Sequence, residues 1–217
     1  MTSDKKAASV ADGLLRQALS SRTVIADGAM GTMNQQYKLS EQDYRGLPGN
    51  SRFVDHPGDL KGNNELLVLT QPEIISKIHE QYLDAGADII DCSSGQVSKK
   101  ERPIYGRMFQ TPFSDRIRNQ ANIATIAVGA IFEADNANTI IAAGRADLCA
   151  VARPHLANPA WILTEGAKSG YADVPWPKQY VAAKIQLERN LEREKQQAAA
   201  AKNAMSFEQI TQIFGEV

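Results

Sequence analysis

A carboxylate and two glycines follow the first apolar run of the sequence. The stretch Asp27–Thr32 reads DGAMGT and comes directly after TVIA at Thr23–Ala26. A glycine has no Cβ, so backbone N–H groups can approach a ligand closely there, and Asp27 adds a carboxylate. The spacing is neither that of a P-loop nor that of a dinucleotide fingerprint, and a tight turn would use the same glycines. Asp27 and Gly28 are therefore candidate substrate-binding residues for a small molecule.

A second candidate site combines a glycine and an arginine that each follow an apolar run. Gly129 comes after TIAV at Thr125–Val128, and Arg153 comes after LCAVA at Leu148–Ala152. A missing side chain lets an N–H approach a phosphate, and a planar guanidinium suits bidentate phosphate contact. The alternative is that Gly129 only ends a strand and that Arg153 forms a surface ion pair.

The residue types that bind metals or act as nucleophiles are few. Cys92 and Cys149 are far apart, which is neither a disulfide framework nor a zinc pattern and fits a reducing cytosol. The histidines have no ligand-like spacing; they are His56, His79 and His155. Cys92 has no assigned base, so we expect a buried or strand-end residue rather than a nucleophile. The sequence predicts no metal site and leaves any catalytic residue unassigned.

The elements that would position these residues alternate between strands and helices. Four apolar runs without polar alternation are typical of parallel strands buried on both faces: Thr23–Ala26, Asp88–Cys92, Thr125–Val128 and Leu148–Ala152. Four helices separate or follow them, with Pro near several starts and Gly after several ends: Pro72–Ala85, Thr111–Asn122, Glu133–Gly144 and Pro159–Ser169. We expect Thr111 to cap its helix and Asp115 to lie in its first turn. The pattern predicts an α/β protein of about four βα units with right-handed crossovers.

Two longer connections follow the ends of predicted strands, where α/β proteins keep functional loops. They are Met33–Asn64, which is rich in Gly, Pro and Asn, and Gln96–Gln110. From Pro177 onward the chain is polar and helical, and its charge run indicates a solvated helix face. The stretch SFEQITQIF near the C-terminus suits a small amphipathic helix.

Composition excludes several classes of function. The 217 residues carry a net charge of −1, so bulk electrostatics favour neither nucleic acid nor an anionic membrane. No run approaches the ~20 apolar residues of a membrane span. The first 22 residues lack the apolar core of a signal peptide and suit a short amphipathic helix. We therefore expect a cytoplasmic protein with a small-molecule ligand.

The first part of the chain resembles the homocysteine-binding domain of cobalamin-dependent methionine synthase. The resemblance covers roughly Leu14–Ile90 and rests on VIADGAMGTMNQQYKLSEQDYRG and DLKGNNELLVLTQPEIISKIHEQYLDAGADII. It implies a (β/α)8 barrel, an Asp-Gly loop near the substrate, and a homocysteine thiolate on a zinc held by three cysteines of late strands. The chain reads DCSSG where that family has an acidic residue followed by Thr and Asn. Because no cysteine lies at a matching position, we expect neither zinc nor methyl transfer.

The second part resembles the old yellow enzyme family of FMN-dependent NAD(P)H oxidoreductases, especially the reductase half of the aminobenzoyl-CoA and salicylyl-CoA monooxygenases. It covers roughly Ala87–Leu191 and rests on SSGQ, TPFSDRIR, IAVGAI, GRADL and ARPHLANPAW. The resemblance implies an FMN phosphate clamp and NAD(P)H as the reductant of an active flavoprotein. The clamp residues would be Gly129, Ala130, Ala152 and Arg153, although that family often has Gly at position 152. The segments that hold the flavin ring and the substrate are missing.

Together the two resemblances predict a fusion at the strand GADII, which fits the second strand of one barrel and the sixth strand of the other. The expected fold is a partial (β/α)8 TIM barrel with a C-terminal helical tail. The predicted domains are residues 1–90, residues 88–191 and residues 192–217. Four strands cannot close a barrel, so a homodimer that completes an eight-stranded barrel is a further hypothesis.

Three functions follow from these resemblances. The leading prediction is a flavin oxidoreductase-like protein with a retained FMN phosphate-binding segment that is catalytically incomplete. The first alternative is a methionine synthase or homocysteine S-methyltransferase-like fragment without its zinc ligands. The second alternative is an inert fusion product.

Overall fold

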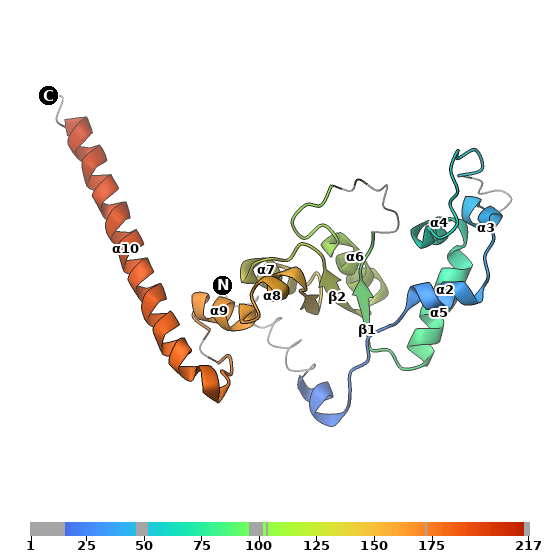
Figure 1. Cartoon of the computed structure of the whole chain (residues 1–217), viewed down its shortest axis with the longest axis horizontal. Coiled ribbons are helices and arrows are strands. Elements are labelled where there is room, and N and C mark those ends of the chain that lie inside the picture. The colour runs from blue at the N-terminus through green and yellow to red at the C-terminus, as the bar shows by residue number, and fades with distance from the viewer. Residues whose placement is uncertain (1–15, 47–51, 96–101, 103, 172, 215–217) are drawn as a thin grey trace. The chain divides into compact units, whose positions relative to one another are not determined.

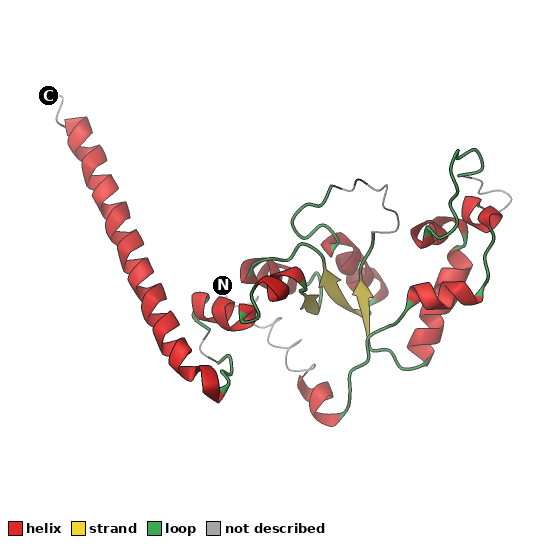
Figure 2. Ribbon diagram, viewed as in Figure 1, coloured by secondary structure: helices red, strands yellow, loops and turns green. Residues whose placement is uncertain are grey.

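The computed structural model describes residues 16–46, 52–95, 102, 104–171 and 173–214, with side chains described as far as residue 202. The chain divides into two compact units, Met1–Val151 and Ala152–Val217. The elements of the first unit are α2 (Met30–Gln36), α3 (Glu41–Arg45), the 3₁₀ helix η1 (Asn64–Leu66), α4 (Leu67–Thr70), α5 (Pro72–Asp84), β1 (Ile89–Cys92), α6 (Thr111–Ala121), β2 (Ala124–Val128), α7 (Ala134–Ala142) and β3 (Leu148–Ala150) (Figure 1). The elements of the second unit are α8 (Arg153–Ala157), α9 (Trp161–Lys168), the 3₁₀ helix η2 (Lys178–Tyr180) and α10 (Val181–Phe214) (Figure 2).

A three-stranded parallel sheet forms the centre of the first unit. Its strand order is β1-β2-β3, so strands that follow one another in the chain are neighbours in the sheet. Parallel neighbours need a crossover, and α6 and α7 supply the two crossovers. The predicted α/β class and three of the four predicted strands are therefore confirmed.

The fourth predicted strand, Thr23–Ala26, is reduced to a single bridge. Ala26 pairs in parallel with Ile89, and two hydrogen bonds flank the bridge. Asp27 N donates to Ile89 O at 2.9 Å, and Asp88 N donates to Ile25 O at 2.7 Å. The ladder does not continue past Asp27, because a side chain there replaces the backbone acceptor that a longer strand would provide.

Helices α6 and α7 pack against the face of the sheet that carries Thr125 and Ala127. Thr125 is fully buried and its hydroxyl donates to Ser114 O of α6 at 3.4 Å. Ala127 is fully buried in a cluster with Ile140 of α7. Side chains on the opposite face alternate with these, since successive residues of a strand point to opposite sides. That opposite face is only half buried, at residues such as Ile126 and Leu148.

The predicted helices are confirmed, with small shifts at their ends. The N-cap of α6 is Gln110 rather than Thr111, and the first turn of α6 holds no acidic residue. Asp115 lies one turn further along and forms an ion pair with Arg145, with Nε and Oδ2 2.9 Å apart. The helix ends at Ala121, and the residue after it, Asn122, takes the left-handed conformation with φ 55°.

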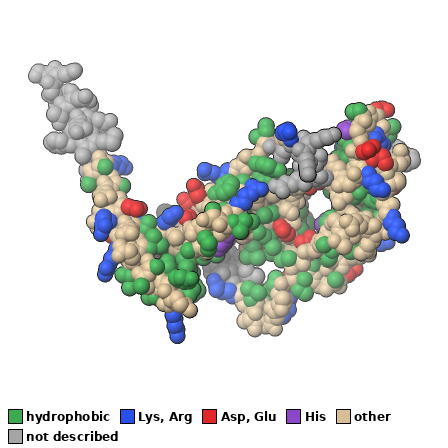
Figure 3. Space-filling model, in the orientation of Figure 1, with side chains coloured by type: hydrophobic (Ala, Val, Ile, Leu, Met, Phe, Trp, Pro, Cys, Tyr) green, Lys and Arg blue, Asp and Glu red, His purple; other side chains and the backbone are tan. Residues whose placement is uncertain are grey.

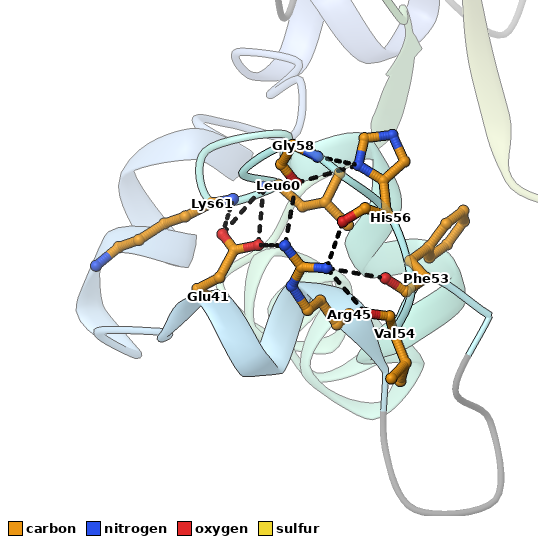
Figure 4. Close-up of polar contacts among 8 residues, drawn as sticks. All are labelled: Glu41, Arg45, Phe53, Val54, His56, Gly58, Leu60 and Lys61. Atoms are coloured by element: carbon orange, nitrogen blue, oxygen red, sulfur yellow. Dashed lines mark hydrogen bonds and ion pairs between the residues drawn. The ribbon is translucent and has the colours of Figure 1, made fainter.

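In the described part of the predicted long connection between Met33 and Asn64, helices and one arginine order the chain. Tyr44, Leu60 and Leu67 form a second buried apolar cluster there. The guanidinium of Arg45 ion-pairs with Glu41 at 2.8 Å. It also donates to four backbone carbonyls (Figure 4), those of Phe53, Val54, His56 and Gly58. The Arg45 side chain alone therefore holds this part of the loop together. The Gly and Pro content of the loop did not indicate such a role for Arg45.

Glu41 completes the same arrangement with both of its carboxylate oxygens. Its carboxylate accepts hydrogen bonds from Leu60 N at 3.0 Å and from Lys61 N at 2.7 Å. These backbone donors, first that of Leu60, lower the pKa of Glu41 below its ordinary value, and Arg45 lowers it further. The backbone at Leu60 and Lys61 is thus held to α3.

The second unit ends in the long helix α10, which includes the backbone of the predicted helix SFEQITQIF. Basic and acidic side chains lie along its described part (Figure 3), and Lys184 Nζ lies 3.8 Å from Glu188 Oε1. Ile185 is about half exposed. The charge run is a solvated helix face, as predicted. Among the described residues, no helix combines the length and apolar character needed to span a bilayer.

Candidate functional site

Two acidic residues, Asp27 and Asp91, lie next to each other at the carboxyl edge of the sheet. Asp27 follows the bridge at Ala26, and Asp91 lies within β1. Asp27 Oδ1 accepts a hydrogen bond from Asp91 N at 2.8 Å. Partial burial, and then the negative charge of Asp27, raise the pKa of Asp91 above its ordinary value. Two like charges held together in this way favour a cation beside them.

Gly28 packs against helix α5. A Cβ added at Gly28 would lie 2.8 Å from a ring carbon of Tyr82, which is closer than real Cβ contacts allow. The absence of a side chain therefore lets α5 approach the loop that carries Asp27. Asp27 and Gly28, predicted as substrate-binding residues, lie at the edge where α/β proteins bind ligands.

Gln110 joins the ends of β1 and β2. Its Oε1 accepts hydrogen bonds from Ser94 N and from Ser94 Oγ, the latter at 2.8 Å. Its Nε2 donates to Val128 O at 3.1 Å, and only 4% of the residue is exposed. A Cβ at Gly129 would lie 2.5 Å from Gln110 Nε2, and Gly129 has φ +105°. The glycine is therefore required by Gln110 and by the backbone conformation.

Gln110 was not predicted from the sequence, because an isolated glutamine has no chemical signature of its own. The sequence offered one clue to Gln110, its position: it is a polar residue directly before Thr-Pro at a helix start, between two strands. Glu65 was also not singled out, and its carboxylate accepts from Gly95 N at 2.7 Å. Both residues fix the turn after β1.

The four residues predicted to clamp a phosphate divide between the two units. Gly129 and Ala130 follow β2 in the first unit, and Ala130 O accepts a hydrogen bond from Met108 N at 3.1 Å. Ala152 and Arg153 belong to the second unit, as the N-cap and the first residue of α8. Neither unit by itself assembles all four residues.

The cysteines do not fit a zinc site. Cys92 pairs with Ala127 across the sheet and Ala127 pairs with Cys149, so the cysteines are two strands apart. At about 4.8 Å per strand their Cα atoms are roughly 10 Å apart, whereas zinc holds each thiolate at about 2.3 Å. Burial raises the pKa of each thiol to about 11, with Asp91 and Asp27 adding to the effect at Cys92.

The histidines lie in separate places. His56 Nδ1 is 3.1 Å from Gly58 O, His79 lies on α5, and the ring of His155 lies 6.0 Å from that of Trp161. Over the described ranges, no three residues among His, Cys, Asp and Glu come together in a way that could hold a metal ion.

A family model described as homocysteine S-methyltransferase matches residues 24–167. The chain belongs to the homocysteine S-methyltransferase family. The match includes Asp27, Asp91 and Gln110, together with all three strands and their crossovers.

Membership of the homocysteine S-methyltransferase family overturns the leading functional prediction. The match runs through the predicted seam at Asp88–Cys92 and includes Gly129 and Arg153. The prediction of a flavin oxidoreductase is therefore wrong, and the FMN and NAD(P)H expected with it have no support. The error has a physical cause: a glycine after a strand and an arginine at a helix start are features of βα units in general, so they do not specify a flavin. The alternative function, a homocysteine S-methyltransferase-like chain, is the one that the match supports.

Proposed function

We propose that this protein binds homocysteine, or a closely related amino-acid thiol, at the carboxyl edge of its sheet. The observation that carries the proposal is the Asp27 carboxylate, which binds the backbone N–H of Asp91 and lies close enough to raise the pKa of the Asp91 carboxyl, in a chain of the homocysteine S-methyltransferase family. In this proposal the sheet is an arc of a (β/α)8 barrel, and ligands of such barrels bind at the C-terminal ends of the strands. The homodimer that would complete the barrel stays a prediction.

The carboxylates would bind the α-ammonium group of the ligand. A cation between Asp27 and Asp91 relieves their repulsion, and charge-assisted hydrogen bonds are about twice as strong as neutral ones. The turn that Gln110 and Glu65 fix after β1 keeps Asp91 in place. Gly28 brings Tyr82 against the loop on the other side.

The proposal concerns binding, and it includes no methyl transfer by this chain alone. In a methyltransferase of this family, zinc would supply the thiolate form of the substrate. The two cysteines lie two strands apart in the sheet and do not come together around one ion, so no step is assigned to zinc.

Isothermal titration calorimetry with homocysteine tests the proposal. We expect saturable binding that Asp27→Asn weakens roughly ten- to a hundredfold, which corresponds to a charge-assisted hydrogen bond of about 1.5–3 kcal/mol. A compound without the amino group, 4-mercaptobutyrate, should not bind at this site.

Asp84→Asn is the matched control, because Asp84 ends α5 and precedes the opposite, amino edge of the sheet. It should bind homocysteine like the unmodified protein. Absence of saturable binding, or equal affinity in the Asp27→Asn variant, would show that the carboxylate pair is not the site.

A further inference from the structure

A pocket lies in the first unit, between the end of α2 and the loop that precedes η1. Its volume is about 420 Å³, and its lining includes Asn34, Lys38, Tyr44, Lys61 and Asn64. None of these residues belongs to the carboxylate pair at Asp27 and Asp91, and the proposed homocysteine site does not use them.

Asn34 is the most unusual residue of this lining. Only 4% of it is exposed, and neither its amide oxygen nor its amide nitrogen has a hydrogen-bond partner in the described structure. Buried amides in folded proteins are almost always hydrogen-bonded, so an unpaired one calls for a partner. Asn34 belongs to the wall of the pocket, so a turn of its side chain would let the unpaired amide bond a polar ligand there.

Two lysines give the pocket its charge. Lys38 and Lys61 are exposed, and within the described ranges neither ammonium lies within ion-pair distance of a carboxylate. Lys38 has φ +48°, a left-handed conformation that is uncommon for a lysine and places it at the turn after α2. Figure 4 shows the side chain of Lys61 extending away from Glu41.

The nearby carboxylate does not cancel these charges. Glu41 already accepts from two backbone N–H groups and pairs with Arg45. These contacts also fix the backbone of Lys61 at the pocket.

Asn64 adds a further donor. Its Oδ1 accepts from the Tyr44 hydroxyl at 2.9 Å, which orients the amide and leaves its nitrogen as a donor toward other groups. The polar groups of this lining are therefore mainly donors: two ammonium groups and the amide nitrogens of Asn34 and Asn64.

We propose that this pocket binds a small anion, a compound that carries a phosphate or a carboxylate. The anionic group pairs with Lys38 and Lys61, and a polar group of the same compound bonds to Asn34 once its side chain turns toward the pocket. A lysine ammonium binds a phosphate and a carboxylate alike, as a point charge. The two lysines therefore do not show which of these groups the ligand carries.

Titration of the ¹⁵N-labelled full chain with inorganic phosphate and, separately, with succinate at low ionic strength tests this proposal by NMR. We expect saturable shifts of backbone amides around Asn34, Lys38 and Lys61 with at least one probe. Shifts with phosphate alone identify a phosphate compound, and shifts with succinate alone identify a carboxylate. Absence of saturable shifts with both probes would overturn the proposal.

Lysine variants give the matched comparison. Lys38→Gln and Lys61→Gln should each weaken anion binding about tenfold, since each removes one of two charges. Lys77→Gln, which changes an exposed lysine of α5 outside the pocket, should leave binding unchanged. Equal weakening by Lys77→Gln would indicate general attraction of anions and contradict the site.

Asn34→Leu separates ligand binding from a structural role of the amide. The change keeps the volume, so we expect weaker anion binding with no loss of thermal stability. Lower stability together with undiminished binding would overturn the role of Asn34. Asp27→Asn should leave anion binding intact, so failure of this proposal and failure of the homocysteine proposal are distinguishable.

Discussion

The cysteine side chains show how position in the sheet controls reactivity. Cys92 lies in β1 with only 5% exposed, and Cys149 lies in β3 beside the cluster around Ala127. Both thiols have lost water without gaining a cationic neighbour, so burial raises their pKa to about 11. This agrees with the sequence-based prediction that Cys92 is a buried residue rather than a nucleophile.

Alkylation tests that environment at the residue scale. A free cysteine has a pKa of about 8.5, so at pH 8 the thiolate fraction of Cys92 and Cys149 should be at least about a hundredfold smaller. We expect iodoacetamide to label the folded protein at both positions at least that much more slowly than the unfolded protein, as followed by mass spectrometry. Labelling of either cysteine at the unfolded rate would contradict the burial of that thiol.

Elements of the first unit depend on a few side chains that bind backbone groups of other segments. Gln110 joins the ends of two strands, and Glu41 and Arg45 of α3 hold the loop that follows it. These residues provide order where the local sequence, rich in Gly, Pro and Asn, provides none. The candidate anion pocket depends on the same order, because Glu41 fixes the backbone of Lys61.

Arg45→Met tests this at the element scale. Arg45 is largely buried, and the substitution leaves Glu41 and several carbonyls without their cationic donor. We expect the free energy of unfolding to fall by about 2–4 kcal/mol in chemical denaturation. Hydrogen exchange should also become faster at the backbone N–H groups of Leu60 and Lys61.

Arg116→Met provides the control for that experiment. Arg116 lies on α6 and bonds only an exposed glutamine, Gln120, in the described structure. Its loss should change the free energy of unfolding by less than about 0.5 kcal/mol. Equal effects of the two substitutions would mean that the Arg45 network does not stabilise the loop.

Contacts between distant parts of the chain stabilise the first unit as a whole. Arg22 donates to both carboxylate oxygens of Asp88 at 2.6 Å, and Ile25 N donates to the same carboxylate at 3.0 Å. The hydrogen bonds from Arg22, and then that from Ile25, lower the pKa of Asp88 to about 2. The pairing holds the chain before Ala26 against the start of β1.

Acid titration tests this contact. The folded pKa of Asp88 is below the unfolded value of about 3.9, so its stabilisation is fully present above that pH and is lost as pH falls toward 2. We expect thermal unfolding temperatures measured from about pH 5 to pH 2 to fall less steeply for Asp88→Asn than for the unmodified protein. Parallel pH profiles for the two proteins would contradict the assigned pKa.

Local sequence predicted the elements well, and their ends less well. Apolar runs gave β1, β2 and β3, and proline and glycine positions gave α5 and α6, because these signals act over a few residues. The first predicted strand became one bridge, since Asp27 uses its side chain to bond Asp91 N. Asp115 was predicted in the first turn of α6 but lies one turn later, because the helix begins at Thr111 rather than after it.

The sequence by itself determined the α/β class, the order of its strands and helices, and the Asp27–Gly28 loop that resembles homocysteine-binding proteins. Those features depend on local patterns. Only the tertiary structure decided that Asp27 lies beside Asp91, that Gln110 joins two strand ends, and that Asn34 and Lys61 share a pocket. These partners are between 16 and 64 residues apart in the chain. Local propensity carries no information about such pairs, because packing of the sheet and its helices brings them together.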